Sequence, residues 1–257
     1  MDSNWISGRA ELFAEAYDLR YLGPEEGELG YLLRHIGSAE GPTLELACGT
    51  GRDLIPLAER GIEMTGIDVS EDMLDRYRQK CDEKNLKVNL QIQAIQELDL
   101  AERFGSVFIA SASVSVLDSE SDVGSMMGRV YEHLLPGGVF LMEHNTPSDR
   151  LPTEEQRRCG MGTGITRRMD PLSPSGTSES TTPAPGVARS LGIYERYVDG
   201  RLQDTELHDG TTGLWETEMV SDHLTAAGFV DVVASAPFRD DEPPSSGWVA
   251  MRCRRPG

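Results

Sequence analysis

The sequence predicts an α/β fold, a parallel sheet with helices on both faces. Apolar segments typical of strands alternate with segments of helical periodicity along most of the chain. The segment Thr43-Leu-Glu-Leu-Ala-Cys-Gly-Thr-Gly51 is typical of a buried strand that runs into a glycine turn, and Gly66-Ile-Asp68 of a second strand that ends in an acid. Such a pair of strands forms a cradle for a nucleoside with a charged tail.

The elements follow from periodicity and from turn residues. Aromatic residues at helical spacing predict a helix over 8–22, and leucines at the same spacing predict another over 25–37. Ser70 is the expected N-cap of the helix after the second strand. The remaining expected elements are, in order, strand 42–47, helix 51–60, strand 62–68, strand 88–93, strand 107–112, helix 122–135 and strand 139–143.

The pattern breaks over residues 148–190. Residues 171–186 have almost no apolar side chains, so they cannot bury enough surface to offset the entropy of ordering, and we expect a mobile loop. Asp199-Gly200 between two alternating runs predicts a hairpin, with a third strand near 210–215. A helix at 217–227 and strands at 229–234 and 247–253 are expected to complete the chain.

Composition narrows the classes of function. The chain has 257 residues and a formal net charge of −19, and such a surface repels nucleic-acid backbones. No apolar run reaches the length of a membrane span, and the N-terminus lacks the pattern of a signal peptide. The four cysteines are scattered, which argues against a metal site or disulfides. We therefore expect a cytoplasmic protein with a small-molecule substrate; its oligomeric state stays open.

The glycine turn distinguishes between two classes of cofactor. A dinucleotide fingerprint needs a third glycine, and Leu54 occupies that place after Gly49 and Gly51. Asp68 follows at a distance that suits the two ribose hydroxyls, because a carboxylate accepts from both at once. The pattern favours S-adenosylmethionine (SAM) over NAD(P), so an NAD(P)-dependent oxidoreductase is the disfavoured alternative.

At these residues the chain resembles the class I SAM-dependent methyltransferases. The resemblance rests on Glu45-x-Ala47-x-Gly49-x-Gly51 and the later acid, and covers roughly residues 15–147 and, more loosely, the last forty. It implies a Rossmann-like sheet of seven strands with the seventh antiparallel. Tyr17-Asp-Leu-Arg-Tyr21 resembles the N-terminal helix of natural-product methyltransferases, including those that act on amino sugars.

The resemblance implies four parts of the chain. Residues 1–40 form a helical cap over the cofactor, 41–147 the SAM-binding core, 148–215 a mobile insertion with an antiparallel lid, and 216–257 the helix and strands that complete the sheet. The implied cofactor-binding residues share their position in the family's motifs: Tyr21, Glu45, Ala47, Gly49, Gly51, Asp68, Val69, Met73, Ile95, Gln96 and Ser111. The acid that often binds adenine after the third strand is absent, and Ile95 and Gln96 stand in its place; Ile95 also suits the core.

The acceptor is expected beyond the carboxyl ends of the fourth and fifth strands. Ser111, Ala112 and Ser113 follow the fourth strand, and Glu143, His144 and Asn145 stand at the end of the fifth. Since its usual pKa lies near neutral pH, His144 is the candidate general base, with a solvated loop histidine as the alternative. His208 could face the acceptor, and the arginine doublets 157–158 and 167–168 could hold a carboxylate.

The predicted function is methyl transfer from SAM to an oxygen or nitrogen of a small molecule, in natural-product biosynthesis. Two alternatives stay open at the level of sequence, because function resides in the site and not in the fold. One is an enzyme of the same fold that uses SAM for another reaction. The other is a non-catalytic SAM-binding partner of a second subunit.

Overall fold

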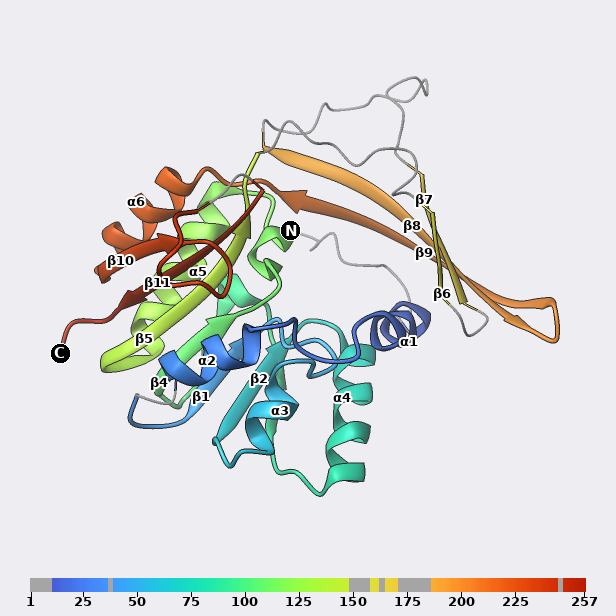
Figure 1. Cartoon of the computed structure of the whole chain (residues 1–257), viewed down its shortest axis with the longest axis horizontal. Helices are drawn as coiled ribbons and strands as arrows, with labels where there is room; N and C mark the ends of the chain where they lie inside the picture. Colours follow the sequence, from blue (N-terminus) through green and yellow to red (C-terminus); the bar gives the residue numbers. More distant parts are fainter. Residues whose placement is uncertain (1–10, 37–38, 148–157, 162–164, 171–185, 245–246) are drawn as a thin grey trace.

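The computed structural model describes residues 11–36, 39–147, 158–161, 165–170, 186–244 and 247–257 (Figure 1). Two helices, α1 (Glu11–Arg20) and α2 (Glu28–Ile36), precede the first strand. The core then follows as β1 (Thr43–Leu46), α3 (Leu54–Ala58), β2 (Met64–Asp68), α4 (Glu71–Lys84), β3 (Asn89–Ile92), the 3-10 turn η1 (Ile95–Glu97), β4 (Phe104–Ile109), η2 (Ser113–Val116), α5 (Glu120–His133) and β5 (Leu134–Asn145).

The second half of the chain adds a separate sheet and then returns to the core. Its elements are β6 (Arg158–Met161), β7 (Ile165–Asp170), β8 (Val187–Val198), β9 (Arg201–Gly213), α6 (Thr217–Ala227), β10 (Val230–Ser235) and β11 (Trp248–Arg254). The main sheet has seven strands in the order β10-β11-β5-β4-β1-β2-β3. Strand β11 runs antiparallel to its two neighbours, β10 and β5, whereas the pairs β1–β2, β2–β3, β1–β4 and β4–β5 are parallel. The predicted fold class is therefore confirmed.

Two apolar layers cover the two faces of this sheet. Helices α2, α3 and α4 pack on one face, and helices α5 and α6 pack on the other. The alternation of β1 shows how the layers arise, because Leu44 and Leu46 point into the α5–α6 layer while Glu45 points to the face that α2 and α3 cover. Each face of the sheet is therefore closed by helices.

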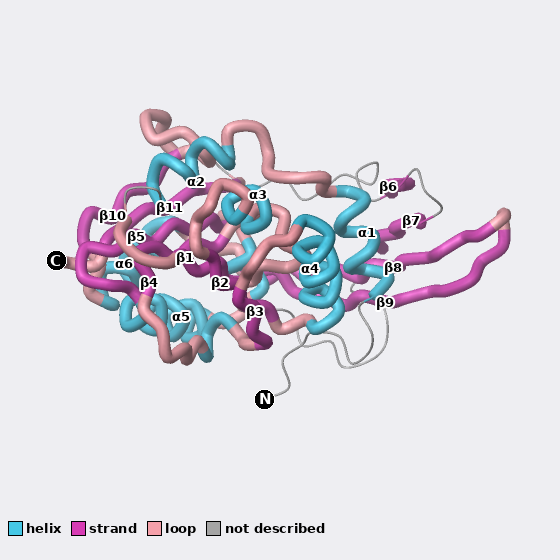
Figure 2. The backbone as a smooth tube through the Cα atoms, turned by 90° about the horizontal axis from the view of Figure 1, so that it is seen from below, coloured by secondary structure: helices cyan, strands magenta, loops and turns pink. Residues whose placement is uncertain are grey.

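The four-stranded sheet differs from the sequence-based prediction. Strands β6 and β7 lie where the sequence showed only a break in the pattern, before the expected loop at 171–186, and the predicted third strand near 210–215 is the end of β9. The antiparallel order β6-β7-β8-β9 forms a sheet that lies beside α1 and extends away from the core (Figures 1 and 2). Charged residues interrupt the apolar alternation of β7, so its strand signal is weak in the sequence. Residues 171–185, most of the expected mobile loop, lie outside the described residues.

Candidate active site

The order of strands places a ligand site at the carboxyl ends of β1 and β4. From β1 the chain continues to β2 and β3 on one side, and then crosses to β4 and β5 on the other. This reversal is a topological switch point, where open α/β sheets bind ligands. Three residues other than glycine have a left-handed backbone conformation there. They are Ala47 (φ 52°) after β1, and Ser111 (φ 56°) and Ala112 (φ 53°) after β4. Such conformations concentrate at functional sites.

The two glycines of the turn after β1 have different roles. Gly49 has φ of 52°, and a side chain there would meet no atom within 4 Å, so its face of the turn is open to a ligand. Gly51 has φ of 83°, and a Cβ there would lie 2.6 Å from the ring of Tyr77 in α4. Gly51 therefore makes room for a side chain of the protein, and its predicted contact with the cofactor stays a prediction.

Gly66 in β2 makes the room that the missing third glycine of a dinucleotide fingerprint would provide. A Cβ at Gly66 would lie 3.0 Å from Leu54 Cδ1 and 2.8 Å from Cys48 Sγ. Because β2 carries the glycine, the first turn of α3 keeps a leucine and still packs closely on the sheet. Helix and strand approach closely here without the glycine that a pyrophosphate seat requires.

Asp68 closes the other side of the turn. Its carboxylate accepts hydrogen bonds from the backbone N–H of Gly49 at 2.8 Å and of Ser70 at 2.9 Å. Burial raises the pKa of Asp68, and the backbone N–H groups around it oppose that shift. A carboxylate has about four acceptor positions, so these two bonds leave capacity for the hydroxyls of a ribose. Ser70 caps α4, as predicted, by accepting from the N–H of Met73 at 3.3 Å.

Helix α1 lies over the turn and is tied to the core. Asp18 accepts from Arg76 Nε at 2.8 Å and from Lys80 Nζ at 2.9 Å, both on α4. Burial acts to raise the pKa of Asp18, but hydrogen bonds from Lys80, Thr50 and Arg76 outweigh it and hold the pKa below its usual value. The rings of Tyr17 and Tyr21 contact each other at a tilt of 46°, with 4.7 Å between centroids. Tyr17 lies within the electrostatic reach of Arg52, Asp53 and Glu45.

The same helix is fastened to the four-stranded sheet. Glu206 of β9 accepts from the backbone N–H groups of Leu12 at 3.0 Å and Phe13 at 3.2 Å, the free donors at the start of α1. Phe13 packs edge-on against Tyr194 of β8 and His208 of β9. His208 therefore supports α1. The helix that covers the turn and the sheet beside it form one packed unit.

A buried cluster of charged side chains lies beneath the turn. Arg52 Nη2 donates to Glu28 Oε1 at 2.6 Å and to Asp53 Oδ2 at 2.8 Å. Glu28 belongs to α2, so this contact fixes α2 against the start of α3. Burial, with the charge of Asp53, raises the pKa of Glu28 to about 7 against the opposing charge of Arg52.

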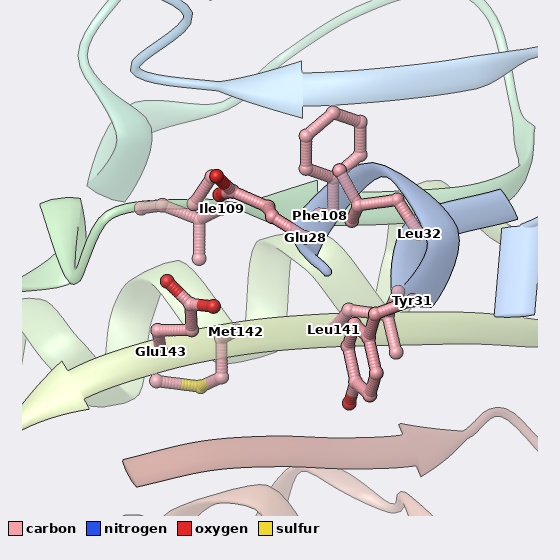
Figure 3. Close-up of a pocket in the computed structure, with 9 residues that line it drawn as sticks. Glu28, Tyr31, Leu32, Phe108, Ile109, Leu141, Met142 and Glu143 are labelled. Atoms are coloured by element: carbon pink, nitrogen blue, oxygen red, sulfur yellow. The ribbon is translucent and has the colours of Figure 1, made fainter. Parts of the chain in front are cut away.

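Glu143 of β5 also lies close to this cluster, on the face of the sheet that α2 covers. It lines a pocket with Glu28, and Figure 3 shows both carboxyl groups at one end, with the Tyr31 ring and Leu141 at the other. Burial, with the charges of Glu28 and Asp53, raises the pKa of Glu143 to about 8, while a hydrogen bond from the backbone N–H of Ser111 opposes the shift. Ser111, expected at the cofactor, thus contacts the neighbouring acid.

His144 does not lie where the sequence placed it. It lies within β5, which extends to Asn145, and it pairs with Val249 of β11. The side chain is 0% exposed, and neither ring nitrogen has a hydrogen-bond partner among the described residues. Burial lowers the pKa of His144. The expectation of a histidine beyond the strand end is therefore wrong, and in this position the ring is closed off from an acceptor.

The other predicted residues surround the Asp68 side of the site. Val69 is exposed, Met73 is buried in α4, and Ile95 is buried in the α5–α6 layer at the start of η1. Gln96 follows on η1. The backbone N–H of Gln93 donates to the carbonyl of Asp68 at 3.0 Å, so the segment before η1 lies against the end of β2. A role in holding adenine stays a prediction for these four residues.

Sequence reasoning missed three residues of the charged cluster, Glu28, Arg52 and Asp53, and placed the fourth, Glu143, at the acceptor edge without a role. Arg52 and Asp53 follow Gly51 directly, so their place beside the turn could have been read from the chain. Glu28 carried no signal, because it lies in a helix outside the motif, 24 residues before its partner Arg52. Arg158 is in β6 and Arg167 and Arg168 are in β7, whereas Arg157 lies outside the described residues, so the expected hold on a carboxylate stays a prediction.

Comparisons with known proteins agree with this site. Residues 43–138 match the methyltransferase domain family. A dTDP-3-amino-3,4,6-trideoxy-α-D-glucopyranose N,N-dimethyltransferase of Streptomyces venezuelae is 29% identical over 136 residues, which are 51% of this chain and 56% of that protein. The related Streptomyces fradiae enzyme, which acts on the 3,6-dideoxy sugar, is 29% identical over 51% of this chain and 52% of its own length. The chain thus spans about half the length of these curated relatives.

Solved structures share the fold. A SAM-dependent methyltransferase from Clostridium acetobutylicum superposes with a TM-score of 0.75 at 16% identity, over 95% of this chain and 98% of that one. The sugar N-methyltransferase KedS8 from Streptoalloteichus gives 0.71 at 18% identity, over 98% and 94%. The fold, the site and the match of residues 43–138 to the methyltransferase domain family support a class I SAM-dependent methyltransferase. The chain resembles the natural-product and amino-sugar types.

The residues present fit SAM. The turn is open at Gly49, where a Cβ would occupy the space for a ligand. Glu45 is 3% exposed and its Oε2 has no hydrogen-bond partner in the described part of the chain, which suits an ammonium group. Asp68 has acceptor positions left for a ribose. When bound, SAM supplies an electrophilic methyl group on a sulfonium.

Proposed function

We propose that this enzyme transfers the methyl group of SAM to a nitrogen of a small molecule. The SAM site at the carboxyl ends of β1 and β4 carries the proposal, because a methyl group presented there faces an acceptor beyond β4 and β5. The two sugar N,N-dimethyltransferases among its relatives support nitrogen as the acceptor atom. Natural-product biosynthesis is the setting proposed from the same relatives.

The burial of His144 favours nitrogen over oxygen. A neutral amine carries the lone pair that attacks the methyl group, whereas a hydroxyl must lose its proton early and needs a base. The base expected from the sequence is fully enclosed in β5. Positioning is then the main task of the protein, as in other reactions between two bound molecules.

We also propose where the acceptor binds and where in the cell the enzyme is located. Strands β8 and β9 flank α1, which covers the SAM turn, so the four-stranded sheet is the proposed lid over the acceptor. Among the described residues, no helix is long and apolar enough to cross a membrane. Cys48, Cys81 and Cys253 are free thiols, which suits the reducing cytoplasm as the proposed location.

Matched pairs of acceptors test the proposal. Nucleotide-linked sugars that differ only in an amino or a hydroxyl group are incubated with the enzyme and SAM labelled in the methyl group. Label is expected in the amino sugar and not in its hydroxyl partner, and Gly49→Val, which fills the donor site, serves as the inactive control. Transfer to the hydroxyl sugar alone would assign the acceptor to oxygen. SAM binding with no transfer to any acceptor would favour a non-catalytic partner.

A further inference from the structure

A pocket with an acidic end lies between α2 and the sheet, beside the SAM site. Its empty space is about 230 Å³, open solvent included. Apolar side chains form most of its wall, and Glu28 and Glu143 form one end (Figure 3). Such a space faces one group of a larger ligand.

The acids of this region exceed the cations that neutralise them. Arg52 pairs with Glu28 and Asp53, which leaves Glu45 and Glu143 without a basic partner in the described structure. Glu45 and Glu143 are 3% and 6% exposed, and one oxygen of each has no hydrogen-bond partner among the described residues. Buried acids are either paired or neutralised by a proton, and burial raises the pKa of both Glu45 and Glu143, so in the free protein protons do this work and a cation from outside the chain could replace them.

A metal ion does not suit the arrangement. In the described part of the chain, no three His, Cys, Asp or Glu side chains are placed to hold one. The acids instead form a row across neighbouring parts of the main sheet, with Asp68 on β2, Glu45 on β1 and Glu143 on β5. Asp68 acts electrostatically on Glu45, and Glu28 acts on both Glu45 and Glu143, so the row runs from the ribose position to the end of β5. The cation that follows this path is the methyl donor.

We propose that Glu143, facing Glu28 across the pocket, recognises the positive charge of the methyl donor and sets the preference of the enzyme for SAM over the demethylated product. SAM carries a sulfonium, an ammonium and a carboxylate, and the product has lost the sulfonium charge. The buried acids therefore attract the donor by one more charge than the product. In the low dielectric of this pocket a single charge changes affinity measurably, so the acids hold the donor more tightly than the product.

The proposal links donor binding to protons. Since the pKa of Glu143 is about 8 and that of Glu28 about 7, both are partly protonated near neutral pH in the free protein. A cation beside them favours the ionised forms, so SAM binding should release protons and product binding fewer. Four groups act on Glu143: Glu28 of α2, Arg52 and Asp53 before α3, and the Ser111 N–H after β4. Its pocket neighbour Tyr31 is acted on by Arg34, Asp240 and Arg252 as well as by Glu143 itself.

Calorimetry with SAM and the product tests the proposal. In Glu143→Gln, which keeps the size of the side chain, the ratio of product Kd to SAM Kd at pH 8 should fall roughly tenfold, the effect of one nearby charge. Product affinity should change less than about twofold. Glu102→Gln, an exposed acid just before β4 at the opposite end of that strand, is the matched control and should leave the ratio unchanged.

The parent enzyme provides a second readout that needs no variant. Its ratio of product Kd to SAM Kd should rise from pH 6 to pH 9, and titrations in buffers of different ionisation enthalpy should show more protons released by SAM than by the product. In Glu143→Gln, the rise of the Kd ratio with pH and the extra proton release on SAM binding should both vanish. Glu28→Gln serves for the same measurements if the first variant does not fold. A ratio that is flat with pH in the parent, or a variant that weakens both ligands equally, overturns the proposal.

Discussion

Replacement of Gly51 by alanine should destabilise the fold far more than the same change at Gly49. Both glycines have left-handed backbone, which costs an alanine about 1–2 kcal/mol. At Gly51 the new Cβ would also lie 2.6 Å from the ring of Tyr77, whereas at Gly49 it meets nothing within 4 Å. Overpacking of this kind costs about 1–3 kcal/mol more. We expect Gly51→Ala to lose about 2–5 kcal/mol and Gly49→Ala about 1–2 kcal/mol.

Urea unfolding measures both losses, provided that the slope with denaturant is unchanged. SAM affinity should show the opposite order among folded molecules, because the Gly49 side chain enters the ligand's space and the Gly51 side chain does not. The variant Tyr77→Leu removes the ring, so the cost of Gly51→Ala should shrink in that background, as a double-mutant cycle would show. Equal unfolding midpoints for the two alanine variants would refute the contact between Gly51 and Tyr77.

Four further results are expected. Asp68→Ala should weaken SAM binding by about 1.5–3 kcal/mol, the range for hydrogen bonds to a charged group, and calorimetry that finds parental affinity would exclude its ribose role. Glu206→Ala should free the first N–H groups of α1, so hydrogen exchange at the start of this helix should rise about tenfold or more; unchanged exchange would contradict the cap. The folded pKa of Glu143, about 8, exceeds its unfolded value near 4.3, so its contribution to stability is complete below about pH 4 and is lost as pH rises toward 8. The melting temperature of Glu143→Gln relative to the parent should therefore rise from pH 4 to pH 8. A difference in melting temperature that stays constant with pH would disprove the pKa shift. His144→Ala should lower the free energy of unfolding by about 2 kcal/mol or more as a cavity in the core and leave kcat within tenfold; a loss of 10²-fold in kcat would restore it as the base.

The sequence was sufficient where local chemistry determines structure. The glycine turn, the acid at the end of β2 and the serine cap of α4 each depend on a few adjacent residues, and each lies where the pattern predicted. It was insufficient where a contact joins distant segments. Glu28 meets Arg52 only because α2 folds back over the start of α3, and Glu206 meets α1 from a strand 194 residues away from Leu12. Hydrophobic periodicity carries no information about such pairs.

The neighbours Glu143 and His144 show how one residue position changes the expected chemistry. The sequence places both near the carboxyl end of the fifth strand, and the usual pKa of histidine made it the candidate base. Strand β5 continues through both residues, so their side chains point to opposite faces of the sheet. His144 is enclosed in a layer without a charged partner, whereas Glu143 faces α2 and the acids around Arg52. Alternation alone separates the two residues but does not tell which face adjoins the SAM site. Which face adjoins the SAM site depends on α2 and the start of α3, because these segments place charged groups around Glu143. In our proposal the acid, rather than the histidine, therefore responds to a cationic donor.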